Sequence, residues 1–304
     1  IYLNDELLLA VNDMHRTWRI DVKGKLKAVN RLAVAFHSPT AFIEKADREG
    51  DIFYASTGCM KGNGALRKAH YMFGWDWGPQ LPDAGIFRSV YLSGFSIARL
   101  DDVRIRQEHG AGGVKLSVES SVRKLSESDT AGNGMLVCKI TAPDGTVLTV
   151  EKEVGINETI EALIEAPQLW WPNGYGEPNL YTCTFEVKVD DKVSETKDVT
   201  FGIKKYTYDK ENNTFHIYIN GVPVFVKGAN WGMSEYMLRC RGAEYDTKVR
   251  LHKEMNFNMI RNWLGSVTDD EFYEACDKYG IMLWDDFWIN SNPNLPYDLN
   301  VFNN

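Results

Sequence analysis

Residues 268–284, Thr268-Asp-Asp-Glu-Phe-Tyr-Glu-Ala-Cys-Asp-Lys-Tyr-Gly-Ile-Met-Leu-Trp284, predict a helix followed directly by a strand. Thr268 and Glu271 have the spacing of a capping box, and acidic residues favour the positive end of a helix dipole. Apolar residues then recur at i, i+3, i+4 and i+7, which gives the helix one buried face: Phe272, Ala275, Cys276 and Tyr279. Gly280 is typical of a helix stop, and Ile281–Trp284 is apolar, as in buried parallel strands.

The pattern upstream extends this alternation of helix and strand. Tyr245–Met255 is predicted to be a helix with Asp246 as its N-cap, and Asn258–Arg261 is predicted to be a short strand. Strand, helix, strand, helix, strand is the opening of a (β/α)8 barrel, which takes about 250 residues. We therefore assign residues 203–304 to the start of a TIM barrel that is truncated at its C-terminal side.

The residues before the barrel pattern predict β structure. Phe215–Ile219 and Val222–Val226 flank Asn220-Gly221, which is the strongest short-range hairpin signal. Val114–Val118 and Phe185–Val189 alternate apolar and polar residues, so that each predicted strand has one buried face.

The β-rich part divides into two predicted domains, so that the fold class is multidomain β plus α/β. Residues 99–202 contain short alternating strands and read as an immunoglobulin-like β-sandwich. Residues 1–98 read as a jelly-roll sandwich that is truncated at its N-terminal side, with strands at Trp18–Val22, Asn30–Phe36 and Phe87–Leu92.

Composition excludes several classes of function. The net charge of −8 and the pI near 5.4 argue against nucleic-acid and anionic-membrane partners, because both require a basic surface. The five cysteines and six histidines are scattered without the spacing of metal ligands, so we expect no metal site. The first residue is Ile1 rather than Met, and we expect the native N-terminus to be absent.

A candidate binding loop lies in residues 67–79, Arg67-Lys-Ala-His-Tyr-Met-Phe-Gly-Trp-Asp-Trp-Gly-Pro79. Asp76 stands between two indoles, Trp75 and Trp77. This combination suits a pyranose, whose flat apolar faces stack on aromatic rings while its hydroxyls need a charged acceptor. The alternative is a core corner of a β-sandwich, where tryptophan-rich turns are common.

Three segments resemble glycoside hydrolase family 2, and the first of them resembles its β-mannosidases in particular. They are Trp75-Asp-Trp-Gly-Pro79 with Gly85-Ile-Phe-Arg88, Leu169-Trp-Trp-Pro-Asn-Gly-Tyr-Gly176 with Pro178-Asn-Leu-Tyr181, and Val226-Lys-Gly-Ala-Asn-Trp231 with Met259-Ile-Arg-Asn-Trp263. The resemblance covers essentially the whole chain. It implies a galactose-binding-like first domain and retaining, exo-acting hydrolysis of terminal β-D-mannosyl residues. The substrates would be β-linked mannosides or mannose-containing oligosaccharides, without any cofactor.

The resemblance also implies roles for individual residues. Asp76 would bind sugar hydroxyls, since a carboxylate forms charge-assisted hydrogen bonds with them, and Trp75 would line the pocket. Arg261 would orient the nucleophilic carboxylate, and Trp263 would form a wall of the sugar subsite at the end of the second strand. The structural alternative for these last two is an interior ion pair and a packed ring.

Two further strand ends are candidates. Asn230 and Trp231 end the first barrel strand, where substrate binding and packing are equally expected. Asp285 and Asp286 cannot form a catalytic pair, because adjacent residues of a strand point to opposite faces. Asp286 is expected to enter the pocket, either binding substrate hydroxyls or supporting another site residue, and Asp285 is expected to be solvated or paired.

The catalytic residues themselves are expected outside this chain. In family 2 the acid/base glutamate follows the fourth barrel strand and the nucleophilic glutamate ends the seventh, so both would lie beyond residue 304. We therefore expect an inactive internal fragment of a longer enzyme. The alternatives are a related exo-β-glucosaminidase or β-galactosidase, or a non-catalytic carbohydrate-binding protein. The oligomeric state stays open, and so does the compartment, with periplasmic, secreted or lysosomal placement favoured.

Overall fold

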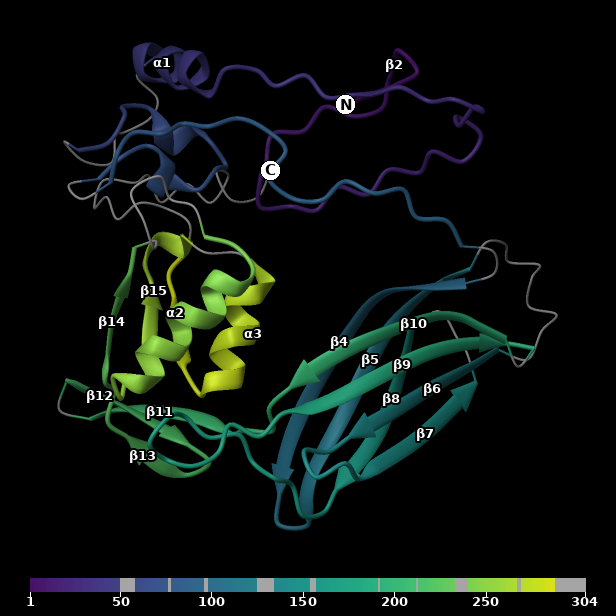
Figure 1. The fold of residues 1–304 in the computed structure, drawn as a ribbon, viewed down its shortest axis with the longest axis vertical. Coiled ribbons are helices and arrows are strands. Elements are labelled where there is room, and N and C mark those ends of the chain that lie inside the picture. The colour runs from purple at the N-terminus through teal and green to yellow at the C-terminus, as the bar shows by residue number, and fades with distance from the viewer. Residues whose placement is uncertain are drawn as a thin grey trace.

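The chain is largely β structure with three α-helices in the part that a computed structural model describes (Figure 1). The described residues are 1–49, 58–75, 78–95, 98–124, 134–153, 157–190, 192–211, 213–232, 240–266 and 269–287. In this part no helix is both long and apolar enough to cross a bilayer.

Residues 98–201 form a sandwich of two antiparallel sheets. One sheet has the order β4-β5-β8 and the other the order β10-β9-β6-β7. The strands are β4 (Ala98–Gly110), β5 (Gly113–Lys124), β6 (Gly134–Thr141), β7 (Val147–Glu153), β8 (Asn157–Ile164), β9 (Tyr181–Val189) and β10 (Lys192–Phe201). A sheet of three strands faces a sheet of four, and all strands pair antiparallel within about a hundred residues. This is the arrangement of an immunoglobulin-like sandwich.

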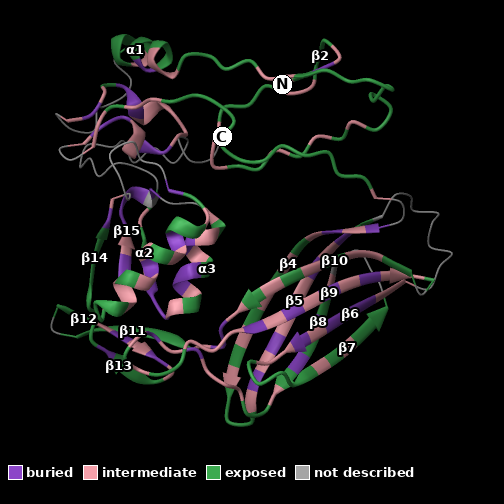
Figure 2. Cartoon of the chain, in the orientation of Figure 1, coloured by how far each residue is buried: buried purple, intermediate pink, exposed green. Residues whose placement is uncertain are grey.

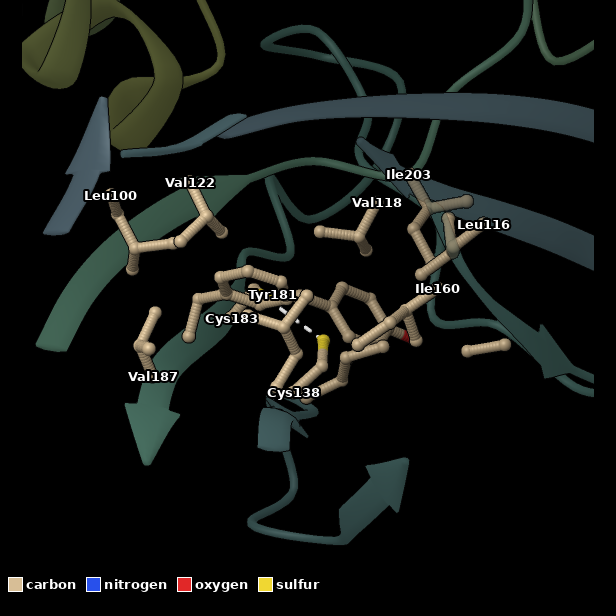
Figure 3. Close-up of a cluster of buried hydrophobic side chains, with 14 of the residues drawn as sticks. Leu100, Leu116, Val118, Val122, Cys138, Ile160, Tyr181, Cys183, Val187 and Ile203 are labelled. Atoms are coloured by element: carbon tan, nitrogen blue, oxygen red, sulfur yellow. Dashed lines mark hydrogen bonds between the residues drawn. The ribbon is translucent and has the colours of Figure 1, made fainter. Parts of the chain in front are cut away.

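The sandwich core follows from the alternation seen in the sequence. Leu116 and Val118 on β5 and Phe185 and Val187 on β9 are fully buried, while their neighbours along each strand are more exposed (Figure 2). Figure 3 shows Leu116, Val118 and Val187 meeting in this core together with Cys138 and Cys183, whose sulfur atoms lie 3.2 Å apart. The strands predicted at 114–118 and 185–189 are thereby confirmed.

A smaller hairpin sheet follows the sandwich, with the order β11-β12-β13. Its strands are β11 (Tyr206–Glu211), β12 (Thr214–Ile219) and β13 (Val222–Val224). Asn220 and Gly221 have φ angles of 52° and 81°, the left-handed pair that a tight two-residue hairpin turn requires. The predicted hairpin is confirmed.

The last described unit alternates strands and helices. Three parallel strands lie in the order β14-β15-β16, and two helices cover one face of them (Figure 1). The elements are β14 (Gly228–Trp231), α2 (Ala243–Glu254), β15 (Met259–Asn262), α3 (Asp270–Tyr279) and β16 (Met282–Asp285). The predicted order of strands and helices is confirmed, and Gly280 ends α3 with a left-handed φ of 71°.

Both predicted helix starts are wrong in detail. Helix α2 begins at Ala243 after Gly242, so Asp246 lies inside its first turn, where it pairs with Lys278. The N-cap position of α3 is Asp269, and Thr268 lies outside the described residues. The Glu271 side chain lies 3.5 Å from Arg241 instead of capping the helix, because a cation from another segment is within its reach.

A seam around Trp170 joins the sandwich to this unit. Trp170 is 1% exposed and packs with Met259 and Met282 below the parallel strands. Its indole nitrogen donates a 2.8 Å hydrogen bond to the carbonyl oxygen of Asp277 on α3, and the ammonium group of Lys204 lies 4.0 Å from its ring.

The first 95 residues contain little regular structure. Their described residues form three two-residue strands, β1 (Tyr2–Leu3), β2 (Glu6–Leu7) and β3 (Leu32–Ala33), and one α-helix, α1 (Pro39–Glu49). Ser38 precedes this helix, and its hydroxyl accepts a hydrogen bond from the backbone of Ala41, so a Ser-Pro helix start that the sequence analysis passed over explains it.

The strands predicted at Trp18–Val22 and Phe87–Leu92 are wrong, and of Asn30–Phe36 only Leu32–Ala33 is a strand. Apolar side chains in these segments remain on the surface, with Tyr91 79% and Leu92 69% exposed. In the described part of the chain, no neighbouring strand supplies the ladder hydrogen bonds that an extended segment needs.

Candidate functional site

The candidate site lies at the carboxyl ends of the parallel strands. Asn230, Arg261 and Trp284 are register partners across β14, β15 and β16, so they form one row on one face of the sheet. The neighbouring row contains Trp231 and faces the helices, where it packs against Tyr245 and Phe272. Since side chains alternate along a strand, the row of Arg261 points away from the helices.

Arg261 and Asp286 form a two-pronged ion pair on this face. The Nε and Nη2 atoms of Arg261 donate to the two carboxylate oxygens of Asp286 at 3.1 and 2.7 Å. The Asp286 side chain is 17% exposed and that of Arg261 is 43% exposed. The backbone nitrogen of Leu264 donates a third hydrogen bond to Asp286 at 3.3 Å. The carboxylate is therefore held in one orientation while the guanidinium group stays accessible.

Asp285 has a separate environment, as the alternation predicts. It accepts a 2.9 Å hydrogen bond from the side chain of Asn262, which belongs to the helix-facing row. Burial and the nearby charge of Asp285 raise the pKa of Tyr273 on α3 to about 12. The expectation that Asp285 is paired is confirmed, and the two aspartates have different partners.

Trp263 follows β15 directly and meets the predicted binding loop. It is 9% exposed, and its ring centroid lies 5.2 Å from that of Trp75, with the planes inclined by 56°. A residue of the N-terminal region thus touches the strand end that carries Arg261. Asp76, the central residue of the predicted loop, lies outside the described residues, together with Trp77.

Close backbone contacts hold the loop that carries Trp75. The backbone nitrogens of Trp75 and Gly78 each donate to the carbonyl oxygen of the other, at 3.1 and 3.3 Å. Gly74 has a φ of 99°, and a Cβ atom there would lie 2.6 Å from the carbonyl oxygen of Gly58. A larger residue than glycine would not fit, so the path of the chain into Trp75 is closely determined.

The remaining candidates at the first strand separate into two kinds. Asn230 is exposed on the face of Arg261 and is free of the helix core. Trp231 is 6% exposed in that core, so its position is explained by packing. Trp284, half exposed in the row of Arg261, was missed as a candidate. Trp284 and Asp286 are two residues apart, so alternation places both on the same face, and this spacing was the available signal.

The arrangement suits a ligand with both apolar faces and hydroxyl groups. Trp75 and Trp284 offer partly exposed rings, the buried ring of Trp263 packs behind Trp75, and the Arg261–Asp286 pair offers directed donors and acceptors at the same strand ends. Among the described residues, no group of three or more His, Cys, Asp or Glu side chains could hold a metal ion.

A cavity of about 2750 Å³ lies elsewhere. Most of its lining belongs to residues 1–95, and Arg261 and Trp263 are not part of it. It coincides with the segments whose predicted strands are unpaired, so we attribute it to apolar surface left uncovered there. The chemistry of the side chains, rather than cavity size, selects the strand ends as the candidate site.

Comparisons with known proteins agree with the family resemblance. The family model described as glycosyl hydrolase 2 galactose-binding domain-like matches residues 1–88, and the model described as glycosyl hydrolases family 2 matches residues 98–204. A mannosylglycoprotein endo-β-mannosidase of Lilium longiflorum is 30% identical over 99% of this chain and 34% of its own length. β-Mannosidase B of Aspergillus fumigatus is 30% identical over 94% of this chain and 35% of its own length.

Solved structures share the fold. The exo-chitosanase of Amycolatopsis orientalis superimposes with a TM-score of 0.59 and 20% identity over 75% of this chain and 29% of its own. A β-glucuronidase of Parabacteroides merdae gives a TM-score of 0.52 and 17% identity over 62% of this chain and 24% of its own. The chain spans about a third of the length of the curated relatives that it matches.

Proposed function

Because the chain belongs to glycoside hydrolase family 2, we propose that it is part of a retaining, exo-acting hydrolase of terminal β-D-mannosyl residues. Relatives named β-mannosidase at about 30% identity support this substrate. The single observation that carries the proposal is the contact of Trp75 with Trp263 beside the Arg261–Asp286 pair. At this contact, two segments that lie far apart in the sequence form one surface of aromatic and charged side chains.

The proposed roles follow from this geometry. Trp75 and Trp263 form walls against which the apolar face of the terminal sugar packs. Asp76 and Asn230 hydrogen-bond sugar hydroxyls, and Asp286 holds Arg261 in place through its two-pronged contact. Arg261 in turn orients the nucleophilic carboxylate.

The catalytic carboxylates are proposed to lie outside residues 1–304. A retaining glycosidase needs an acid/base and a nucleophile about 5–5.5 Å apart. The described carboxylates at the strand ends do not meet this need, since Asp285 and Asp286 lie on opposite faces of the sheet. The 304-residue chain by itself is therefore proposed to be inactive.

The proposed domain layout is the one that the sequence predicts. Residues 1–98 would be a galactose-binding-like jelly roll, residues 99–202 the immunoglobulin-like sandwich, and residues 203–304 the start of a TIM barrel. The parallel order β14-β15-β16 with helices on one face supports the barrel assignment. So does the site, because barrel enzymes place their chemistry at the carboxyl ends of the strands.

Cleavage of aryl glycosides by the full-length protein tests the proposal. We expect release of the aryl group from the β-mannoside at a kcat/KM at least about 100-fold above that for the β-glucosaminide and the β-galactoside, a difference of about 2.7 kcal/mol. Preference for either of the other two would assign the related specificity. Binding of mannosides without cleavage of any of them would assign a carbohydrate-binding protein.

A second candidate is endo-acting hydrolysis, and it is favoured by one observation. The lily endo-β-mannosidase aligns with 99% of this chain, and the Aspergillus fumigatus β-mannosidase B with 94%. The products distinguish the two modes. Exo action releases free mannose from a mannose-terminated oligosaccharide, whereas endo action releases a larger glycan from a mannosylglycoprotein.

A further inference from the structure

An acidic residue away from the strand ends joins the N-terminal region to the helices. Asp269 occupies the N-cap position of α3 with an extended backbone (φ −84°, ψ 132°), yet its side chain makes no cap hydrogen bond. An aspartate at this position ordinarily accepts a hydrogen bond from the first turn of its helix. The carboxylate of Asp269 has other partners.

These partners come from two segments, the start of α2 and the N-terminal region. The hydroxyl of Tyr245 on α2 donates a 2.8 Å hydrogen bond to Asp269. The guanidinium groups of Arg88 and Arg241 each lie 3.7 Å from its carboxylate. Arg241 also donates a 3.1 Å hydrogen bond to the carbonyl oxygen of Phe87. Residues 87–88 of the N-terminal region are thus held against the start of α3 by two cations that share one carboxylate.

The Asp269 carboxylate also interacts electrostatically with the segment that carries the binding loop. Burial, followed by the charges of Asp269 and Asp83, raises the pKa of Tyr71 to about 12. The backbone nitrogen of Gly74 donates to the carbonyl oxygen of Tyr71 at 3.4 Å, and Trp75 follows immediately. Asp269 therefore lies near the base of the loop whose tryptophan meets Trp263.

We propose that Asp269 is a positioning residue, which fixes the N-terminal region on the α/β unit and so sets the place of Trp75 in the sugar site. It does not touch the substrate itself. Its side chain is 16% exposed, while those of Arg88 and Arg241 are 44% and 56% exposed. Each cation alone would contribute little at such exposure, so the effect depends on the shared, half-enclosed carboxylate. This inference rests on the proposed function for its kinetic consequence.

The substitution Asp269→Asn in the full-length protein tests the proposal. Asparagine keeps the size of the side chain and an acceptor for Tyr245, but removes the charge that attracts both arginines. We expect KM for the aryl β-mannoside to rise about tenfold with kcat within twofold, because Trp75 binds the sugar in the ground state and the transition state alike. Glu254→Gln, which breaks a pair with Arg250 inside α2, is the matched control and should leave KM unchanged.

A double-mutant cycle with Trp75→Ala separates positioning from a general structural effect. If Asp269 acts through Trp75, the double variant should have the KM of Trp75→Ala alone, since the effects of coupled residues do not add. Independent effects on KM that multiply in the double variant would overturn the proposal.

Hydrogen exchange supplies a readout that does not depend on activity. In Asp269→Asn, amides of residues 58–75 and 78–95 should exchange at least about tenfold faster, while those of the sandwich strands should keep their rates. Unchanged exchange in these N-terminal segments would also overturn the proposal. If the full-length protein cleaves no aryl glycoside, the proposed function fails and the exchange rates alone decide the role of Asp269.

Discussion

Arg261 and Asp286 combine properties that structural ion pairs and binding groups usually show separately. The carboxylate is mostly enclosed and receives three hydrogen bonds, whereas the guanidinium group stays nearly half exposed. A surface pair would leave both partners in water, where it contributes little, and full burial of both would carry a large desolvation cost. Leu264, whose nitrogen donates to Asp286, has a left-handed φ of 53°, which is unfavourable for a leucine. Such backbone strain is typical of a constrained functional site.

The pair gives the first prediction. Asp286→Asn in the full-length protein should lower kcat/KM for the aryl β-mannoside about 100-fold, because the freed guanidinium group no longer holds the nucleophile in line. Asp285→Asn is the matched control, since its carboxylate faces the helices and pairs with Asn262. Steady-state kinetics of both variants measure the change in kcat/KM, and thermal unfolding shows whether either variant is destabilised. Equal losses of kcat/KM in the two would contradict the role given to Asp286.

A buried histidine gives a prediction about pH. His70 is 2% exposed, and burial lowers its pKa from 6.5 to about 4. Between these values the unfolded chain binds more protons than the folded one, so stability present above pH 6.5 is lost as the pH falls toward 4. The loss amounts to about 3 kcal/mol over this range.

Urea unfolding at several pH values between 7 and 4 measures this effect. In His70→Gln, the number of protons taken up on unfolding in this pH range should fall by about one, so the unfolding free energy should depend less steeply on pH. This holds whatever the stability of the variant at pH 7. His37→Gln, at an exposed position in the same region, is the control. The same slope in wild type and His70→Gln would show that the histidine does not titrate as described.

At the scale of elements, local patterns predict most of the α/β unit and the sandwich. The hairpin at Asn220-Gly221, the apolar face of α3 and the alternation along β5 and β9 need only neighbours in sequence to be recognised. The helix starts were displaced because Arg241 and Lys278, which lie far from their partners in sequence, capture Glu271 and Asp246. The N-terminal strands failed for a related reason, since an extended segment forms a strand only when another pairs with it.

The candidate site, like the elements, could be predicted from the sequence only in part. Arg261, Asp286 and Trp263 could be placed from strand parity and from the family resemblance. The resemblance assigned Trp75 and Trp263 to one sugar pocket, but their direct contact was not predicted, because no periodicity links residues so far apart. Trp284 was missed, since its register opposite Arg261 appears only once the parallel strands are aligned.

The close approach of two parallel strands gives a prediction at this scale. A Cβ atom on Gly228 would lie 2.0 Å from the carbonyl oxygen of Met259 on β15. Gly228→Ala should therefore push β14 away from β15 and destabilise the protein by about 2–3 kcal/mol. Gly85→Ala, where a Cβ atom would meet nothing within 4 Å, should change stability by less than about 0.5 kcal/mol. Denaturant unfolding compares the two, and a stable Gly228→Ala variant would refute the packing described.

At the scale of the whole molecule, the sandwich and the α/β unit act together through the seam at Trp170. The ring is buried against Met259 and Met282, and its nitrogen bonds to α3. Gly202 permits this contact, because a Cβ atom there would lie 2.7 Å from the Cβ atom of Trp170. Together with the hairpin sheet β11-β12-β13, which lies at the lower end of the parallel strands (Figure 1), the Trp170 segment of the sandwich thus packs against the strands that carry the site.

Loss of this seam should uncouple the two units. Trp170→Ala should cost about 3–5 kcal/mol, as removal of a buried tryptophan commonly does. Calorimetry of the variant should show the α/β unit unfolding before the sandwich, whose core does not include Trp170. A single cooperative transition at the wild-type temperature would mean that the seam does not link them.

The most direct test of the account is a crystal structure of the full-length protein with a mannose-configured inhibitor bound. We predict that the sugar ring lies within about 4.5 Å of the rings of Trp75 and Trp263, a distance at which apolar groups are in contact. Its hydroxyl groups should lie within hydrogen-bond reach of Asp76 and Asn230. A sugar bound away from the ends of β14 and β15, with Trp75 and Trp263 still packed only on each other, would contradict the shared site.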